Sequence, residues 1–197
     1  MGLYSIKPRF QNLIKTLVQI SIRRNIHPDL YTYGAVLASV LAVLSIWLGY
    51  NSSSVYLLLI FPLLFIRILF NALDGLVARA QNVADPLGRV KNEFGDRVSD
   101  VIVISGLFFV PDINVHLVAA ILALTLLSSY LGILGAKRIY AGIMAKADRM
   151  LLLVAFFTIN AFVSNPIINY GFLALIILGL LQTIFIRLRI LAEENDQ

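Results

Sequence analysis

The sequence predicts an all-α integral membrane protein, a bundle of six transmembrane helices preceded by an amphipathic helix at the membrane interface. Three observations support this fold class. Hydrophobic residues make up 59% of the 197 positions and charged residues 14%, with a mean hydropathy of +0.87, which is far too apolar for a soluble domain. The apolar residues form runs close to the ~20 residues that a helix needs to cross a bilayer. Short polar turns separate these runs.

The N-terminal segment, residues 1–26, combines basic side chains with an apolar stripe. Apolar residues at positions 10, 13, 14, 17 and 20 share one face of a helix. The basic residues around this stripe are Lys7, Arg9, Lys15, Arg23 and Arg24. This pattern is typical of a helix that lies on the membrane surface. We therefore expect an interfacial helix over residues 1–26 and a single membrane domain over residues 27–197.

Six apolar runs predict the membrane spans. They cover, in order, Leu30–Tyr50, Val55–Ala80, Gly88–Val110, Val115–Gly135, Met150–Val163 and Ile167–Ile186. An even number of spans puts both termini on one side of the membrane. Lys and Arg gather in the N-terminal helix, in the 79–91 and 137–149 loops and near the C-terminus, whereas the opposite loops hold none. The positive-inside rule therefore predicts a protein of the cytoplasmic membrane, with both termini and any site near the 79–91 loop facing the cytoplasm.

The charge and the cysteine count narrow the function classes. The sequence has no cysteine, which excludes disulfides, thiolate metal sites and cysteine nucleophiles. The net charge is +5, and the basic residues lie at the ends of the predicted spans. We interpret this charge as attraction to an anionic membrane surface and to phosphate-bearing substrates, and not as a sign of nucleic-acid binding.

Residues 71–100 predict a helical hairpin that carries polar groups at membrane depth. On its first helix, spacings of three, four and seven place on one face Asn71, Asp74, Gly75 and Ala78. On its second helix, spacings of four place on one face Asn92, Asp96 and Asp100. The segment between them is rich in turn-forming residues. Acidic residues inside membrane-length helices are costly and usually functional.

Two carboxylates of this hairpin, Asp74 and Asp96, suit a hard divalent cation such as Mg²⁺ or Mn²⁺, which would bind substrate phosphates. The alternatives for acids at this depth are ion pairs with arginine, or an ion or proton path in a transporter. Gly75 and Gly88 allow a close backbone approach by a ligand, or tight helix packing. Arg79 suits either a phosphate or an anchoring position at the interface.

The same residues resemble the signature of the CDP-alcohol phosphotransferase family, which reads D-x2-D-G-x2-A-R-x8-G-x3-D-x3-D. The positions in register are Asp74, Gly75, Ala78, Arg79, Gly88 and Asp96, while Asn71 and Asn92 replace the first and third aspartates. The motif covers residues 71–96, and the expected topology extends the resemblance weakly over the rest of the chain.

The resemblance implies an enzyme that transfers a phosphatidyl-type group from a CDP-linked lipid, CDP-diacylglycerol, to an alcohol and releases CMP. It implies two divalent metals, with Asp96 as the general base on the acceptor hydroxyl. The implied metal ligands are Asn71, Asp74, Asn92 and Asp96. The implied nucleotide-binding residues are Asp74, Gly75, Ala78, Arg79 and Gly88. The expected partners are the CDP-lipid, the alcohol, membrane lipids and a second copy of the chain in a homodimer, without nucleic acid.

The two asparagines change the expected metal site. An asparagine oxygen can ligate a hard cation but carries no charge, so the four-residue set is less negative by two units. The site is then expected to hold its second metal weakly or to recruit Glu93. A natural subfamily is favoured because the rest of the motif is intact. The alternatives to a natural subfamily are an engineered inactive form and a catalytically degenerate relative that binds nucleotide-lipid. An ion-coupled transporter is a further alternative for the function.

A basic cluster follows the fourth predicted span. Its members are Lys137, Arg138, Lys146 and Arg149. They suit a phosphate on the acceptor, such as glycerol phosphate or inositol phosphate, and they equally suit anchoring at the cytoplasmic interface.

The hairpin also predicts an ion pair between Arg67 and Asp100. If the chain turns near residues 83 and 84, residues at equal depth have numbers that sum to roughly 167, which sets Arg67 opposite Asp100. A lone charge at that depth costs roughly 3 kcal/mol, so each residue has reason to pair with the other. In the competing interpretation Asp100 is the base and Asp96 is a ligand, which slides the motif by one turn. The absence of a glycine at Asn92 argues against it.

Overall fold

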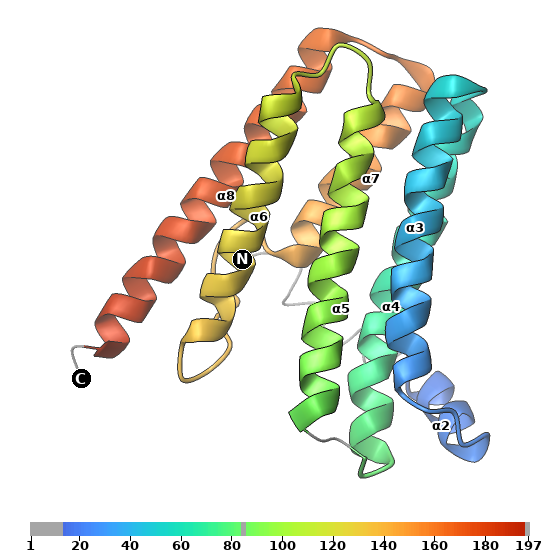
Figure 1. Ribbon diagram of the computed structural model, residues 1–197, viewed down its shortest axis with the longest axis vertical. Helices are drawn as coiled ribbons and strands as arrows, with labels where there is room; N and C mark the ends of the chain where they lie inside the picture. Colours follow the sequence, from blue (N-terminus) through green and yellow to red (C-terminus); the bar gives the residue numbers. More distant parts are fainter. Residues whose placement is uncertain (1–13, 84–85, 196–197) are drawn as a thin grey trace.

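The computed structural model describes residues 14–83 and 86–195, and every regular element in these ranges is a helix (Figure 1). The elements are, in order, α2 (Lys15–Arg23), α3 (Asp29–Asn51), the 3₁₀ helix η2 (Ser54–Leu59), α4 (Ile60–Ala80), α5 (Pro86–Ser105), the 3₁₀ helix η3 (Gly106–Phe109), α6 (Val115–Leu134), α7 (Lys146–Phe162) and α8 (Pro166–Asn195).

Among the described residues, four stretches are long and apolar enough to cross a membrane. These are Asp29–Asn51, Ser54–Ala80, Val115–Leu134 and Pro166–Glu194. The protein is therefore an integral membrane protein. The other two predicted spans correspond to α5, which carries six charged side chains, and to α7, which has 17 residues. Both fall short of the apolar length that identifies a span from sequence, so six complete spans stay a prediction.

The predicted boundaries differ from the structure at several places. Helix α7 begins at Lys146, four residues before the predicted start at Met150, and α5 ends at Ser105 and continues as a 3₁₀ helix within the predicted third span. Helix α8 continues to Asn195, nine residues beyond the predicted end at Ile186, because the helical pattern does not break at the basic residues that follow. The second predicted span begins as a 3₁₀ turn before α4. The predicted turn of the hairpin lies partly outside the described residues, which omit positions 84 and 85.

The predicted interfacial helix is described only in its C-terminal part, α2, because residues 1–13 lie outside the described ranges. Helix α2 packs against α4. Ile14, just before it, is buried, whereas Leu17, Ile20 and Ile22 are exposed. A helix with exposed apolar side chains beside a membrane domain is compatible with the predicted interfacial position.

Helix α3 packs along both α4 and α5, whereas α4 and α5 touch each other only locally. The predicted hairpin is therefore held together by a third helix that the motif did not indicate. On the other side of the bundle α6 packs along α8, and α7 contacts η2, α4 and α8. A buried apolar cluster joins the layers and includes Ile46, Leu107, Phe156 and Phe157.

Close helix approach depends on small residues, as is common in membranes. A Cβ atom on Gly95 of α5 would lie 2.8 Å from Cγ2 of Thr32 on α3, and a Cβ atom on Gly106 would lie 2.4 Å from Cδ1 of Ile46. Both contacts are too short for any larger residue without movement. Glycine at these positions lets α5 and η3 lie directly against α3.

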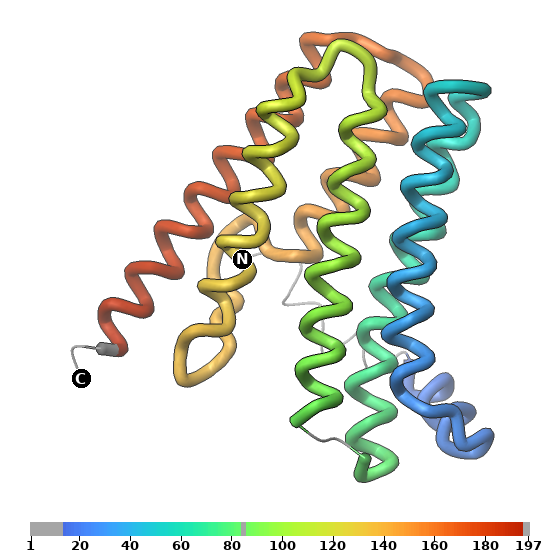
Figure 2. Tube along the Cα trace, viewed as in Figure 1, coloured from blue at the N-terminus to red at the C-terminus, as the bar shows by residue number. Residues whose placement is uncertain are grey.

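The polar connections gather at one end of the bundle. The α4–α5 turn, the loop between α6 and α7, helix α2 and the end of α8 all lie at the same end in Figures 1 and 2. The short connections α3–η2, η3–α6 and α7–α8 lie at the other end. This arrangement brings the two halves of the motif close to the basic loop that precedes α7.

Candidate functional site

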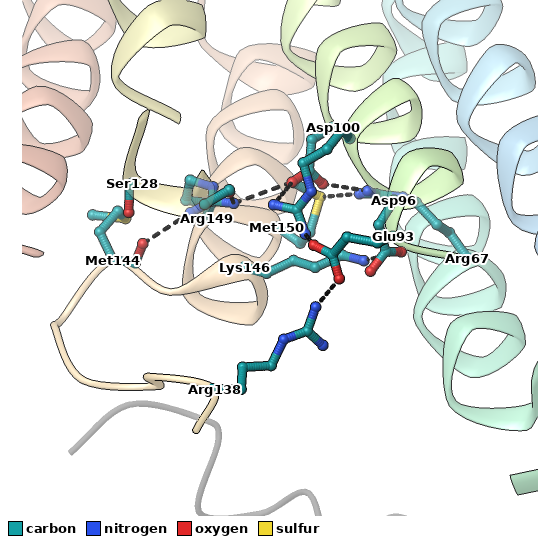
Figure 3. Close-up of polar contacts among 12 residues, drawn as sticks. Arg67, Glu93, Asp96, Asp100, Ser128, Arg138, Met144, Lys146, Arg149 and Met150 are labelled. Carbon is teal, nitrogen blue, oxygen red and sulfur yellow. Dashed lines mark hydrogen bonds and ion pairs between the residues drawn. The ribbon is translucent and has the colours of Figure 1, made fainter. Parts of the chain in front are cut away.

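Asp96 lies on α5 and forms an ion pair with Lys146, the first residue of α7 (Figure 3). The Lys146 Nζ atom donates to Asp96 Oδ1. The side chains of Lys146 and Asp96 are 19% and 13% exposed, so the pair is largely enclosed and still reachable from solvent. The loop between α6 and α7 thus supplies a cation to the motif's last carboxylate.

Asp74 lies on α4, is buried, and accepts a hydrogen bond from the hydroxyl of Thr32 on α3. Asp74 and Asp96 lie near enough for their charges to repel each other. Asn71, one turn before Asp74, is half-buried, and its Nδ2 atom finds no hydrogen-bond partner among the described residues. Two acids and one unsatisfied amide therefore gather where α4 approaches α5.

This donor set fits one hard cation better than two. Within residues 14–83 and 86–195, no group of three or more acidic, histidine or cysteine side chains is placed to hold a metal. Asp74 and Asp96 offer carboxylate oxygens, and Asn71 and the half-buried Asn92 offer neutral amide oxygens. Carboxylate and amide oxygens are suitable ligands for Mg²⁺ or Mn²⁺, but this set carries two negative charges and not four.

The predicted nucleotide-binding residues lie on α4 and on the first turn of α5. A Cβ atom on Gly75 would lie 3.4 Å from Nη1 of Arg79, so the Arg79 guanidinium folds back over Gly75. Ala78 and Gly88 are half-buried and Arg79 is exposed. Their role towards a nucleotide stays a prediction.

A pocket of about 420 Å³, including its open mouth, lies beside the Asp96–Lys146 pair. Its lining consists of Glu93, Asp96, Arg97, Ser129, Gly132, Ile133, Arg138, Ile139, Tyr140, Lys146, Arg149 and Arg187. Five cations face two acids in this lining, so the pocket suits an anion. Three of the four residues of the predicted basic cluster line it, whereas Lys137 is exposed and is not part of the lining.

Glu93 connects two of these cations. Its Oε1 atom accepts from Arg97 at 2.5 Å, and its Oε2 atom accepts from Arg138. Glu93 was considered above as a substitute metal ligand, but both of its oxygens face guanidinium groups. Figure 3 shows Arg138 reaching towards Glu93 from the loop before α7.

One turn further along α5, Asp100 is fully buried among arginines. The Arg67 Nη2 atom donates to Asp100 Oδ1, and Arg149 Nη2 donates to Oδ2 at 3.2 Å. Arg97 Nη1 lies 4.0 Å from the same Oδ2 atom. Arg67 and Asp100 are the two residues that the hairpin register set at equal depth. Because both Asp100 oxygens face guanidinium groups inside the protein, an acceptor alcohol has no direct path to this carboxylate.

Sequence reasoning missed Arg187 and Thr32. Arg187 is buried, lines the pocket, and its Nη1 and Nε atoms donate to the carbonyl oxygens of Ser128 at 2.5 Å and Ala141 at 3.1 Å. The only sequence signal was a charged residue at the end of the apolar run of α8, whose apolar residues surround the helix and mark no single buried face. Thr32 carried no comparable signal, because a single threonine in an apolar helix does not reveal which acid it will meet.

Comparisons with known proteins agree with the motif. The family model for CDP-alcohol phosphatidyltransferase matches residues 25–188. The inner membrane protein YnbA of Escherichia coli (strain K12) is 35% identical over 156 residues, which is 77% of each chain.

Solved structures share the fold. The phosphatidylinositol phosphate synthase PgsA1 of Mycobacterium tuberculosis with CDP-DAG bound superposes with a TM-score of 0.72 at 21% identity, covering 88% of this chain and 90% of that chain. The same enzyme with manganese and citrate also gives 0.72 at 21% identity, covering 88% and 86%. With the family model, the curated relative and the fold in agreement, the chain belongs to the CDP-alcohol phosphatidyltransferase family.

Proposed function

We propose that this protein transfers a phosphatidyl-type group from CDP-diacylglycerol, or a similar CDP-linked lipid, to the hydroxyl of an alcohol acceptor and releases CMP. The observation that carries the proposal is a motif carboxylate, Asp96, that lines a cationic pocket, with the second motif carboxylate, Asp74, near enough on α4 for the two charges to repel each other. Family membership supports the reaction class, and the similar fold of an enzyme solved with CDP-DAG supports the donor.

In the reaction, the acceptor oxygen attacks the phosphorus that carries the diacylglycerol. A new P–O bond forms to the acceptor, the P–O bond to CMP breaks, and CMP leaves with the electron pair. The acceptor proton goes to Asp96, whose carboxylate opens on the pocket. A positioned carboxylate of this kind contributes roughly 10²–10⁴-fold to such a rate.

The metal proposed for this site is Mg²⁺ or Mn²⁺, held by Asp74 and Asp96 with a side-chain oxygen of Asn71 or Asn92. When bound, it would neutralise negative charge on the pyrophosphate and on the departing CMP. Next to it on α4 and α5 lie the proposed nucleotide contacts Gly75, Ala78, Arg79 and Gly88. The manganese complex of the similarly folded PgsA1 supports this choice of metal.

The acceptor proposed for the pocket carries a phosphate. Arg138, Arg149 and Arg187 line the pocket together with Lys146, and arginine can bind phosphate through two parallel hydrogen bonds. Ordinary anchoring at the cytoplasmic interface explains an exposed arginine such as Arg138. It does not explain Arg149 and Arg187, which are buried.

We also propose that all six helices from α3 to α8 cross the cytoplasmic membrane, with both termini and the pocket on the cytoplasmic side. The gathering of the basic connections at one end of the bundle supports this orientation. A homodimer is the proposed assembly. Cysteine accessibility in inverted and right-side-out vesicles tests the orientation, since the natural chain has no cysteine.

The decisive experiment measures CMP release from labelled CDP-diacylglycerol by the purified full chain with Mn²⁺ and a panel of alcohols. The panel pairs each free alcohol with its phosphate ester, such as glycerol with glycerol phosphate and inositol with inositol phosphate. We expect CMP release with a phosphorylated acceptor, and loss of release in Asp96→Asn. No release with any acceptor, despite intact CDP binding, would count against transfer.

A second candidate is a relative that binds nucleotide-lipid without turning it over. Asn71 and Asn92 favour it, because they remove two of the four motif carboxylates. The two candidates differ in one measurement. CDP-diacylglycerol binding that leaves the lipid intact over hours at saturating Mn²⁺, with every acceptor of the panel, would support the binding protein.

A further inference from the structure

Lys146 stands out because it donates directly to the carboxylate that the family motif assigns to metal and base. Asp96 Oδ1 accepts from its ammonium, and the two residues are 50 positions apart in sequence. Helix α7 therefore begins where its first side chain can reach α5. The pair is largely enclosed, where the attraction between opposite charges is stronger than on an exposed surface.

The two motif acids differ in their neighbours. Asp96 is paired with a cation, whereas Asp74 accepts from the neutral hydroxyl of Thr32 and forms no ion pair with any described residue. Asn71 lies one turn from Asp74 and keeps a buried amide nitrogen without a partner among the described residues. The Asp74 side of the site thus has no cationic partner among the described residues, while the Asp96 side already has a positive charge.

The charges of the site favour one divalent cation. Asp74 and Asp96 carry two negative charges, and Lys146 adds one positive charge. Counted over these three side chains alone and without substrate, one divalent cation brings the total to +1, and a second would raise it to +3 within a partly enclosed space. Crowding like charges in that way is strongly unfavourable. In a motif with four aspartates, two divalent cations would be neutralised completely.

We propose that the Lys146 ammonium takes the place of the second metal, so that this chain binds one divalent cation and supplies the other positive charge from α7. The proposal rests on the proposed function for the identity of the substrate, but not for the count of metal ions. It assigns Lys146 a positioning role towards Asp96 and the substrate phosphates. It also explains why the chain tolerates asparagine at positions 71 and 92.

The test counts Mn²⁺ ions bound by the purified full chain at saturating CDP, from the electron paramagnetic resonance signal of free Mn²⁺. We expect one tightly bound Mn²⁺ per chain. Lys146→Met removes the competing positive charge and is expected to raise the affinity for that Mn²⁺ by at least about tenfold. Lys146→Arg keeps a positive charge and should stay near the wild-type affinity.

A matched control is Lys137→Met. Lys137 belongs to the same loop but is exposed and lies outside the pocket lining, so its removal should leave Mn²⁺ affinity unchanged. A general effect of net charge would instead raise the Mn²⁺ affinity equally in both methionine variants, and that result would overturn the proposal.

A second test restores the two motif carboxylates with the paired substitution Asn71→Asp and Asn92→Asp while Lys146 is kept. With Lys146 present, we expect a second Mn²⁺ to bind at least about tenfold more weakly than the first. Adding Lys146→Met should make the second site tight. Two equally tight Mn²⁺ ions in the paired variant with Lys146 present would overturn the proposal, even if Lys146→Met fails to fold.

The outcomes separate this proposal from the proposed function. Two Mn²⁺ ions bound to the wild-type chain would overturn the role of Lys146 and leave the transfer reaction untouched. One Mn²⁺ ion, with no response to Lys146→Met, would have the same effect. No Mn²⁺ at all in the presence of CDP would overturn both.

Discussion

Asp96 and Asp100 lie one turn apart on α5, and each is paired with a cation, yet their surroundings differ. Asp96 lines the pocket with a 13% exposed side chain, whereas Asp100 has no exposed surface and faces Arg67 and Arg149. A carboxylate that opens on a pocket can exchange protons with a bound molecule. One that is enclosed by guanidinium groups cannot do so without local unfolding. Depth along a single helix face therefore distinguishes the proposed catalytic carboxylate, Asp96, from the buried ion-paired one, Asp100.

The pocket-facing Asp96 and the buried Asp100 also differ in the type of cation that binds them. Asp100 is bound by arginines, whose planar donors stay charged and hold several hydrogen bonds at once. Asp96 is bound by a lysine, a compact point charge on a flexible stem. An arginine network fixes α4, α5 and α7 relative to one another. A lysine can turn from its carboxylate to a ligand without disturbing the helices.

The largest effect is expected from Asp96→Asn, which keeps the shape of the side chain but removes the proton acceptor. CMP release should fall by roughly 10²–10⁴-fold, while the protein stays folded because the buried network of Arg67, Asp100 and Arg149 is untouched. Turnover assays measure the loss of CMP release, and thermal unfolding in detergent measures whether the variant stays folded. Near-normal turnover in this variant would assign the base elsewhere, and Asp100 would be the first residue to test.

Asp100→Leu should have the largest effect on stability, about 3–5 kcal/mol, because it leaves Arg67 and Arg149 buried without their carboxylate. Arg67→Leu should cost less, because Asp100 keeps its contact with Arg149. The double variant should recover part of the loss but not all of it, since Arg149 still lacks its partner. Urea or thermal unfolding of the purified variants measures these differences.

The prediction is tested most directly by the order in which these three variants lose stability. If Arg67→Leu were the most damaging of the three, Asp100 would depend mainly on Arg67, and Arg149 would contribute little. If Asp100→Leu folded normally but lost all turnover, the division between Asp96 and Asp100 would be wrong.

The sequence was sufficient for features that depend on local spacing. Apolar runs predicted the all-helical membrane fold, and the interval between Arg67 and Asp100 placed both at one depth, because helices rise by a constant amount per residue. The family motif lies within 26 residues and is readable without a structure.

The rest depended on contacts between helices that are distant in sequence. The pairing of Lys146 with Asp96 depends on where α7 begins, and the hydrogen bond from Thr32 to Asp74 depends on how closely α3 approaches α4 and α5. Neither contact follows from the periodicity of the sequence, because periodicity shows which residues share a helix face but not which helix packs against that face. Arg138 and Lys137 are adjacent basic residues with the same composition signal, and only the path of the loop separates them.

A smaller effect is expected at Gly95, where α5 meets α3 within the motif segment, directly before Asp96. Gly95→Ala places a methyl group 2.8 Å from Cγ2 of Thr32, and Thr32 cannot rotate freely because its hydroxyl donates to Asp74. We expect a loss of about 1–3 kcal/mol in stability and weaker Mn²⁺ binding.

Thr32→Ser provides the matched rescue for Gly95→Ala. Serine lacks the clashing methyl group but keeps the hydroxyl that donates to Asp74. The double variant should regain most of the stability and the Mn²⁺ affinity. If Thr32→Ser gave no recovery, the close contact between α5 and α3 would not be the reason for glycine at this position.

The smallest effect is expected at Arg138, the most exposed of the cations that line the pocket. Its ion pair with Glu93 has a 42% exposed arginine side chain, and pairs of this kind contribute about 0–1 kcal/mol to stability. Arg138→Gln should therefore unfold like the wild type. Its effect should appear in KM for a phosphorylated acceptor, which we expect to rise roughly tenfold at unchanged kcat, because a charge-assisted hydrogen bond contributes about 1.5 kcal/mol or more.

Lys137→Gln is the neighbouring control for Arg138→Gln. It removes the same charge from the same loop but from a side chain outside the pocket lining, so KM should not change. Activity assays at two salt concentrations separate a direct contact from general attraction, because salt screens the latter over about 10 Å at 0.1 M. Equal changes in both variants, disappearing at high salt, would make Arg138 part of the cytoplasmic surface charge. In that case the acceptor site would be confined to the buried cations of the pocket lining, Arg149 and Arg187.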